Sequence, residues 1–387
     1  MISTDFAPNE TRADASLSLS LLAKSKNWYV GPQADEVAGR LVAYLPGHQF
    51  TMYLTARAGL YNYLKALNLP PKSHVLVTGF TCEAVVIPVK ALELVPVFVD
   101  IDRETFSMDV AQVKKHISEH TRLIILQHTF GIPPHRKEII ALAKESGIPV
   151  IEDLAHGFDE QMFRKDSYET DKLFSFGRSK VMSSVYGGAV ATHNTKLHLR
   201  LTHMQDDIPY PKNAFLIKCL LYKPIHMLVK STYDSGLGKA LHFISNKLDV
   251  FPKELSKIER MLGMDAYVLK KYPNALAHLL SAQLDRFDEV QEARRITTNY
   301  YADSQGIALH NLPLGRFPLL VKNRDELRSK LAKKNIFLGR WYNYVLAKPG
   351  ERPVAEEVSR HIINLPTLVP IKDAERVINE IDTSLIV

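Results

Sequence analysis

Cysteine is scarce in this chain, and long apolar runs are absent. Only two cysteines, Cys82 and Cys219, occur in 387 residues, so no disulfide framework is expected and a reducing, cytoplasmic setting is favoured. No charge-free apolar run approaches the roughly 18–20 residues that span a bilayer. The first residues lack the basic start and apolar core of a signal peptide, so none is expected.

The composition is that of a globular protein, with 46% hydrophobic and 24% charged residues and a formal net charge of +7. A basic balance favours anionic ligands: phosphorylated substrates, nucleic acid or an acidic membrane surface. A basic surface without such a partner is an equal alternative. The length allows one large domain and a smaller one.

Between residues 74 and 192, short apolar runs alternate with helical patterns, which predicts a mostly parallel, doubly wound sheet. Ligands of such sheets bind at the carboxyl ends of the strands. The expected strands are 75–77, 95–101, 123–126, 148–151, 173–176 and 188–192, and the expected helices are 60–67, 108–118 and 135–146.

The remainder of the chain is mainly helical. The pattern predicts one long helix over 276–304 and then a small α/β domain. Its expected strands are 317–321 and 336–338, and its expected helices are 324–333, 353–361 and 371–384. We therefore divide the chain into 1–265, an N-terminal segment and large domain with a helical insertion at 203–265, and 266–387, the long helix and small domain.

Lys180 and Asp153 are the chemistry-bearing pair of the sequence. Asp153 follows the predicted strand 148–151, and Lys180 lies in a serine-flanked loop after the strand 173–176. Pyridoxal phosphate needs a lysine for a Schiff base and a carboxylate that keeps its pyridine nitrogen protonated. Alternatively, Lys180 is a solvated surface charge and Asp153 a helix cap.

Neighbouring residues are candidates for holding the same cofactor. His156 is expected either to bond the phenolic oxygen of the ring or to be an ordinary loop histidine. Ser175 and Ser179 are candidate phosphate hydroxyls. The backbone N–H groups of a helix start complete such a site, and residues 55–60 precede a good helix. There Arg57 and Ala58 are expected to bind the phosphate, and a plain helix start is the alternative.

Several segments, taken in order, resemble the nucleotide-sugar aminotransferase family (the DegT–StrS group), over about 25–202 and 265–385. The matching segments are 26–32 (KNWYVGP), 98–102 (FVDID), 127–131 (QHTFG), 151–156 (IEDLAH), 174–176 (FSF) with Lys180 and 187–190 (GGAV), and 353–356 (PVAE) with 365–366 (LP). The resemblance implies the pyridoxal phosphate-dependent transferase fold type I: a mostly parallel, seven-stranded-type sheet in the large domain and a smaller C-terminal α/β domain.

The chain departs from the family pattern at several positions. Arg57 stands where the family has a phosphate-binding threonine. Cys82 aligns with the aromatic residue that stacks on the cofactor ring, so it is counted among the cofactor contacts. Tyr186 replaces an acidic residue before the double glycine. Residues 271–278 (KYPNALAH) replace the family's RMSDxQAA.

The resemblance implies an aminotransferase with pyridoxal 5'-phosphate and no metal, taking an amino group from glutamate to a keto-sugar, one that is nucleotide-linked. It also implies a homodimer in which Lys271 or Asn274 reaches the neighbouring active site, with Tyr29 as a further substrate or neighbour contact. Small molecules, not nucleic acid, are the expected partners. The alternatives are a lipid-linked sugar, a keto-cyclitol or another carbonyl acceptor, or a non-catalytic, membrane-associated descendant.

The insertion has no good counterpart in the family. Residues 212–248 carry six lysines and one aspartate among a dozen apolar residues. A basic amphipathic segment is typical of peripheral contact with an anionic membrane, here the inner face. The favoured alternative is a helical insertion that packs on its own domain or on a partner subunit.

Overall fold

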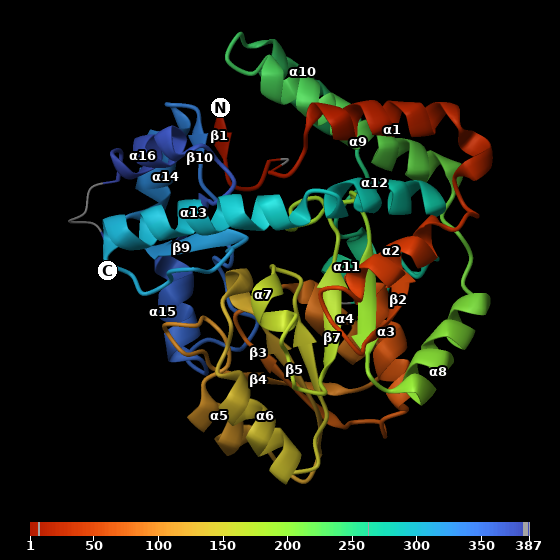
Figure 1. The fold of residues 1–387 in the computed structure, drawn as a ribbon. Coiled ribbons are helices and arrows are strands. Elements are labelled where there is room, and N and C mark those ends of the chain that lie inside the picture. The colour runs from red at the N-terminus through yellow and green to blue at the C-terminus, as the bar shows by residue number, and fades with distance from the viewer. Residues whose placement is uncertain (7, 262, 382–385, 387) are drawn as a thin grey trace.

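The computed structural model describes residues 1–6, 8–261, 263–381 and 386, and shows a large domain and a smaller one (Figure 1). The large domain holds a seven-stranded sheet in the order β2-β8-β7-β6-β5-β3-β4. Strands β4, β3, β5, β6 and β7 run parallel, and β8 is antiparallel to both β7 and β2. The strands are β2 (Gln49–Tyr53), β3 (His74–Thr78), β4 (Val95–Val99), β5 (Thr121–Gln127), β6 (Val150–Asp153), β7 (Asp171–Ser175) and β8 (Gly188–Thr192). The predicted mostly parallel sheet is confirmed.

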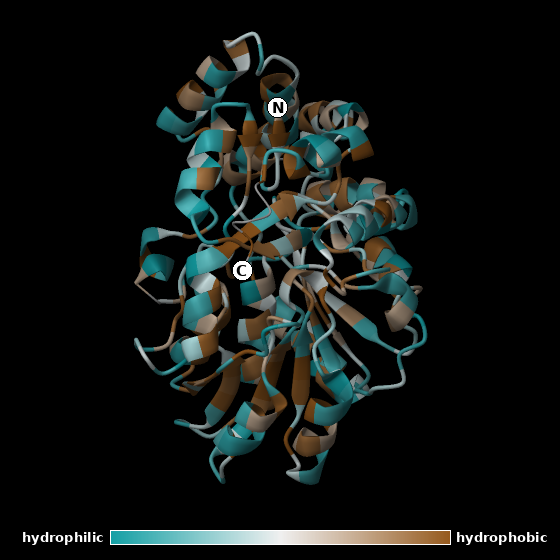
Figure 2. Ribbon diagram, turned by 90° about the vertical axis from the view of Figure 1, so that its left-hand side faces the viewer, coloured by the Kyte–Doolittle hydropathy of each residue, from teal (hydrophilic) through white to brown (hydrophobic). Residues whose placement is uncertain are grey.

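Alternate residues of the strands face opposite layers, because side chains of a strand point to opposite faces with a period of two. Leu76 and Ile124 pack with α5 (Val110–His116) and α6 (Arg136–Glu145) on one face, whereas Val75 and Ile125 pack with α3 (Ala56–Leu67) on the other. Apolar residues line these strands in Figure 2. The helices around the sheet are α2 (Gln33–Leu41), α3 (Ala56–Leu67), α4 (Glu83–Ala91), α5 (Val110–His116), α6 (Arg136–Glu145), α7 (Glu160–Phe163) and α8 (Thr195–Asp206).

The small domain is built on two short sheets. Strands β9 (Arg316–Leu320) and β11 (Ile362–Pro366) are antiparallel, and β10 (Ile336–Phe337) pairs in parallel with β1 (Ile2–Ser3). The start of the chain thus joins the small domain, whereas the sequence placed it with the large one. The helices are α14 (Arg324–Ala332), α15 (Pro353–His361) and α16 (Ile371–Ile378). Part of the predicted helix 371–384 lies outside the described residues.

The long helix expected over 276–304 is interrupted, so that prediction is wrong. Helix α12 (Asn274–Leu284) ends before Arg286, and α13 (Phe287–Gln305) follows it. Arg286 lies outside helical dihedral angles, and its guanidinium donates a 2.5 Å hydrogen bond to Asp14. The break lets α12 pack on α1 (Arg12–Ala23) and α2 while α13 packs on α16 of the small domain.

The insertion folds as helices α9 (Asn213–Ser231), α10 (Leu237–Lys247) and α11 (Lys257–Arg260). Helix α9 packs along α1 and is buried along one side, and α10 packs on α9. Lys223 of α9 is fully buried and pairs with Glu10 at 3.2 Å, so it is a core residue and not a surface charge. Within the described part of the chain, none of the helices combines the length and apolar character needed to cross a bilayer.

A buried network of charges fixes β6, the strand that ends in Asp153. Glu152 lies 2.6 Å from Arg136, 2.7 Å from His128 and 3.2 Å from Lys172. Burial alone would raise the pKa of Glu152, but the hydrogen bonds from His128 and Arg136 hold it well below its usual value. These contacts of Glu152 hold the carboxyl end of β6, and with it the Asp153 backbone, in place.

Candidate active site

A cavity of about 500 Å³ opens at the carboxyl ends of the parallel strands, where it meets the small domain. Gln127 ends β5, Asp153 ends β6 and Ser175 ends β7, and all three line the cavity. The small domain closes the other side with residues 340–344. The sequence therefore predicted the correct edge of the sheet.

Lys180 lines this cavity from the loop after β7. Its Nζ lies 4.7 Å from the centroid of the Trp341 ring, and its carbonyl oxygen accepts a hydrogen bond from the Asn9 side chain. Burial, and then the positive charge of Arg316, lower the pKa of Lys180. A lowered pKa enriches the neutral amine, which is the nucleophilic form.

Asp153 shares the cavity with Lys180. One carboxylate oxygen accepts a 3.0 Å hydrogen bond from the Ala155 backbone. Burial raises the pKa of Asp153, although the Ala155 hydrogen bond and the charge of Lys180 act in the opposite direction. A buried carboxylate of this kind is stabilised in its charged form only when a cationic N–H comes within reach.

His156 lines the cavity, but its ring nitrogens are both engaged by protein groups. Nδ1 accepts a 3.2 Å hydrogen bond from the Phe130 backbone, which leaves the proton on Nε2. Nε2 lies 2.6 Å from the Tyr342 hydroxyl and donates to it. Burial, followed by the charges of Lys180 and Arg316, holds the pKa of His156 well below its usual value, so the ring is neutral. These contacts favour the alternative of a histidine with satisfied neighbours, and a bond from His156 to the phenolic oxygen of the cofactor stays a prediction. The Tyr342 side chain lines the same cavity.

The N-terminus of α3 is the candidate phosphate cup. The Ala58 N–H donates to the Thr55 hydroxyl, which caps the helix, and the Ala58 side chain is fully buried in the core. The preceding N–H groups of Ala56 and Arg57 have no carbonyl one turn back, and both residues line the cavity. This bond of the Ala58 N–H argues against Ala58 as a phosphate contact, which stays a prediction.

Glycine at position 188 lets the sheet approach this helix start. A Cβ atom on Gly188 would lie 2.3 Å from the Ala56 nitrogen, far inside contact distance. Ser175 and Ser179 also line the cavity, as the sequence predicted, and are available as hydroxyl donors.

The Arg57 side chain binds residues of the insertion. Its guanidinium forms an ion pair with the buried carboxylate of Glu259 and donates a 2.6 Å hydrogen bond to the Glu254 carbonyl. These contacts direct it to the insertion, which argues against the expected replacement of the family's threonine by the Arg57 side chain. Its backbone N–H remains part of the cup.

Two further side chains around the cavity hold the same segment of the insertion, which we call the flap (residues 249–260). The Tyr186 hydroxyl donates to the Lys253 carbonyl, and Arg178 lies 3.4 Å from Glu254. Arg57 and Tyr186 are departures from the family pattern. Both residues thus bind the flap, which has no counterpart in the family pattern.

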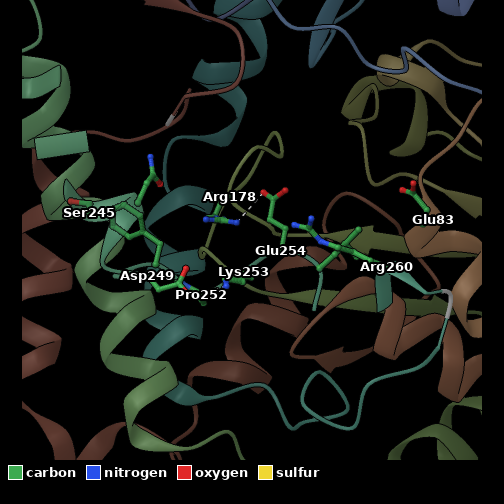
Figure 3. Close-up of a pocket in the computed structure, with 11 residues that line it drawn as sticks. Glu83, Arg178, Ser245, Asp249, Pro252, Lys253, Glu254 and Arg260 are labelled. Atoms are coloured by element: carbon green, nitrogen blue, oxygen red, sulfur yellow. Dashed lines mark ion pairs between the residues drawn. The ribbon is translucent and has the colours of Figure 1, made fainter. Parts of the chain in front are cut away.

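The flap forms most of a second cavity of about 600 Å³ beside the first (Figure 3). The two cavities share Glu83, Arg178, Glu254 and Leu255. Figure 3 shows Arg178 pointing toward Glu254 at this boundary. The second cavity also holds Ser245, Asn246, Asp249, Phe251, Pro252, Lys253 and Arg260. Its charges balance, and it presents hydrogen-bonding groups of both kinds beside an aromatic ring.

Cys82 lines the first cavity, where the sequence placed it. Its sulfur caps α4 by accepting from the Ala84 N–H at 3.5 Å, and burial raises the pKa of the thiol. The aromatic surface that it cannot provide is supplied by Trp341, Tyr342 and Tyr344 of the small domain.

The three residues expected at a neighbouring subunit lie outside this cavity. The Asn274 side chain bonds the Gln33 N–H and the Asn27 carbonyl within its own chain, which favours Lys271 over Asn274 as the residue that would reach a partner. Tyr29 contacts Asn213. The Lys271 ammonium donates to the Asp206 carbonyl at 3.2 Å and lies 5.8 Å from the centroid of the Tyr210 ring, and its role toward a partner stays a prediction.

Sequence reasoning missed the residues that come from distant segments. Asp5 lines the cavity and binds Arg316 at 2.6 Å, and Arg316 stacks on Trp341 with 3.4 Å to the ring centroid. The aromatic pair Trp341-Tyr342 after the predicted strand 336–338 was the signal available in the sequence.

The sequence model of the DegT/DnrJ/EryC1/StrS aminotransferase family matches residues 10–207, just over half of the 387 residues. The chain belongs to this family. The match covers the sheet, the helix start of the phosphate cup and the loop with Lys180, and it ends where the insertion begins.

Two curated relatives are similar over the same part of the chain. The L-glutamine:2-deoxy-scyllo-inosose aminotransferase of Streptomyces paromomycinus is 31% identical over 152 residues, 39% of this chain and 36% of that protein. GDP-perosamine synthase of Escherichia coli O157:H7 is 32% identical over 148 residues, 38% of this chain and 41% of that protein. The chain thus matches well under half of the length of these relatives.

The solved structures support the fold over the whole chain. NtdA from Bacillus subtilis with bound cofactor PMP has a TM-score of 0.73 at 17% identity, covering 98% of this chain and 84% of that one. The likeness confirms the expected α/β fold of pyridoxal phosphate-dependent transferases.

Pyridoxal 5'-phosphate is the cofactor of this family, and the residues of the cavity fit it. Lys180 offers an amine of lowered pKa, and Asp153 offers a carboxylate whose pKa is raised by burial. The free N–H groups at the start of α3 suit a phosphate. The cavity thus offers a partner for the Schiff base, for the pyridine nitrogen and for the phosphate of the cofactor.

Proposed function

We propose that this protein is a pyridoxal phosphate-dependent aminotransferase that moves an amino group from glutamate to the ketone carbon of a sugar. The observation that carries the proposal is the meeting of Lys180, Asp153 and the open helix start of α3 in one cavity. The cofactor, when bound, supplies an electron sink that stabilises negative charge on the substrate carbon.

The chain's own residues divide the remaining work. The Lys180 Nζ would hold the cofactor and would move a proton to and from the substrate carbon. Asp153 keeps the pyridine nitrogen protonated. His156 positions the Tyr342 hydroxyl, and Tyr342 lines the cavity. Ala56, Arg57 and Ser175 orient the phosphate through two N–H groups and one hydroxyl.

The shape of the site favours an acceptor with an extension. The first cavity, of about 500 Å³, must hold the cofactor as well as the reacting ring, and the second cavity continues from it. We propose a keto-sugar that is nucleotide-linked, whose non-reacting part enters the second cavity. A keto-cyclitol and a lipid-linked sugar are the alternatives.

We also propose that the protein acts in the cytoplasm as a homodimer. Lys271, whose ammonium donates one hydrogen bond to a carbonyl and lies over the Tyr210 ring, is our candidate for a residue that reaches the partner's cavity.

The test is an amino-transfer assay with purified protein, pyridoxal phosphate and L-glutamate. Acceptors are a nucleotide-linked keto-sugar and a keto-cyclitol, each compared with a sample without acceptor. The proposal expects 2-oxoglutarate to form in step with the aminated product, faster with the nucleotide-linked ketone. Cofactor binding with no transfer to any ketone would contradict the proposed reaction.

A further inference from the structure

Helix α10 exposes an unusual number of large apolar side chains. Leu237 is 55% exposed, Phe243 67%, Ile244 50% and Leu248, directly after the helix, 68%. Leu237, Ile244 and Leu248 are spaced by seven and four residues, so they share one face of the helix. Single exposed apolar residues are common, but four within twelve positions form a surface that calls for a partner.

The other face of α10 is already occupied. Gly238 and Ser245 are buried against the rest of the chain, and a Cβ atom on Gly238 would lie 2.2 Å from the Val229 carbonyl of α9. The helix is therefore held close to α9 and presents its apolar face outward. Figure 1 shows α10 at the edge of the molecule, beyond α9 and α1.

Positive charge accompanies this apolar face. Lys239 and Lys247 are exposed, lie on the side of the helix where Phe243 is found, and within the described residues form no ion pair. The acids nearest in sequence are engaged: Asp234 by the N-terminal ammonium at 3.4 Å and Asp249 by Lys253 at 2.8 Å. The exposed face of α10 is therefore apolar and cationic at once.

We propose that α10 docks this protein on an anionic lipid surface. Leu237, Phe243, Ile244 and Leu248 enter the boundary between headgroups and acyl chains, and Lys239 and Lys247 bind the anionic headgroups. This arrangement is that of an interfacial amphipathic helix, which lies in the membrane plane and does not cross it. The inference goes beyond the proposed reaction and does not depend on turnover.

The experiment is vesicle sedimentation with the full-length protein carrying its cofactor. One set of vesicles is phosphatidylcholine alone, and the other contains about 30 mol% phosphatidylglycerol, each at low and high salt. We expect binding to the anionic vesicles, weakened by salt because the lysine contribution is screened. Equal binding to both sets, or binding to neither, would overturn the proposal.

Two variants separate the contributions. Lys239→Gln with Lys247→Gln should lower the partition coefficient about 25-fold, since each lysine near such a surface is worth about fivefold. Phe243→Ser should lower it about tenfold or more through lost apolar insertion. Loss of the salt dependence with unchanged binding would contradict the assigned role of the lysines.

A matched control comes from α8, on a different part of the molecule. Leu199 is 62% exposed, and Lys196 lies exposed on the same helix. Leu199→Ser with Lys196→Gln should leave vesicle binding unchanged. Sedimentation velocity of each variant checks the oligomeric state. If Phe243→Ser changes that state and not vesicle binding, the face is an interface between copies of the chain and the proposal is wrong.

Discussion

Trp341 of the small domain lies over the ammonium of Lys180, with 4.7 Å between Nζ and the ring centroid. The same ring stacks on Arg316 at 3.4 Å. The nucleophile of one domain is thus shielded from water by an aromatic residue of the other. Shielding of this kind is the main cause of the lowered pKa of Lys180.

Replacing Trp341 should therefore change the pH dependence of cofactor loading. In Trp341→Ala, water reaches Lys180, its pKa rises toward the ordinary value, and less of the neutral amine is present at pH 7. We expect loading with pyridoxal phosphate to slow several-fold at pH 7 and to recover at alkaline pH. Trp341→Phe keeps a ring and should behave nearly as wild type. An unchanged pH profile in Trp341→Ala would contradict the shielding role.

Asp153→Asn tests the carboxylate partner of the cofactor. Loss of one charge from a buried hydrogen-bonded pair typically costs about 2–5 kcal/mol, so the dissociation constant of the cofactor should rise roughly 30-fold or more. Turnover should fall by orders of magnitude, because the pyridine nitrogen is no longer held protonated. Asp171→Asn is the control. Asp171 begins β7, whereas the cavity lies at the other end of that strand, so this variant should retain the cofactor. Full activity in Asp153→Asn would show that another carboxylate has this role.

The ion pair between Arg57 and Glu259 should hold the flap. Glu259 is fully buried, so Arg57→Ala leaves an uncompensated charge, and we expect a loss of about 3–5 kcal/mol in urea unfolding with faster proteolysis in 249–260. Glu259→Ala should do the same, and the double variant should lose less than the sum. Asp288→Ala breaks an exposed pair with Arg164 and should cost at most about 1 kcal/mol.

The same pair of variants decides whether Arg57 also binds the phosphate. If its guanidinium serves only the flap, Arg57→Ala and Glu259→Ala weaken cofactor retention equally. A much larger loss of cofactor in Arg57→Ala than in Glu259→Ala would restore the direct phosphate contact that the sequence suggested.

The sequence predicted those parts of the fold whose signal is local. The strand 188–192 was placed with its true ends, and the parallel strands with Asp153 and Lys180 at their carboxyl edge followed from apolar runs and spacing. β2 was missed, although its residues Gln49–Tyr53 alternate between polar and apolar side chains. The break at Arg286 was also missed, because it depends on a hydrogen bond to Asp14, which is distant in sequence.

The sequence predicted a site residue correctly only where its position follows from the end of a single strand, as for Asp153. Long-range contacts decided the rest: His156 is bonded by Tyr342 and Phe130, and Arg57 by Glu259. A sequence pattern cannot show that a side chain already has a partner. The same holds for α9, whose apolar side and Lys223 are buried against α1 and Glu10, which confirms that the insertion packs on its own domain.

The most direct test of the central role of Lys180 is the absorbance of the cofactor bound to the protein. Wild type loaded with pyridoxal phosphate should absorb at about 420 nm, as a lysine-bound cofactor does, and L-glutamate should remove this band with release of one 2-oxoglutarate per site. Lys180→Ala should be folded, lack the band and form no 2-oxoglutarate. A Lys180→Ala protein that keeps both the band and the reaction would contradict the account.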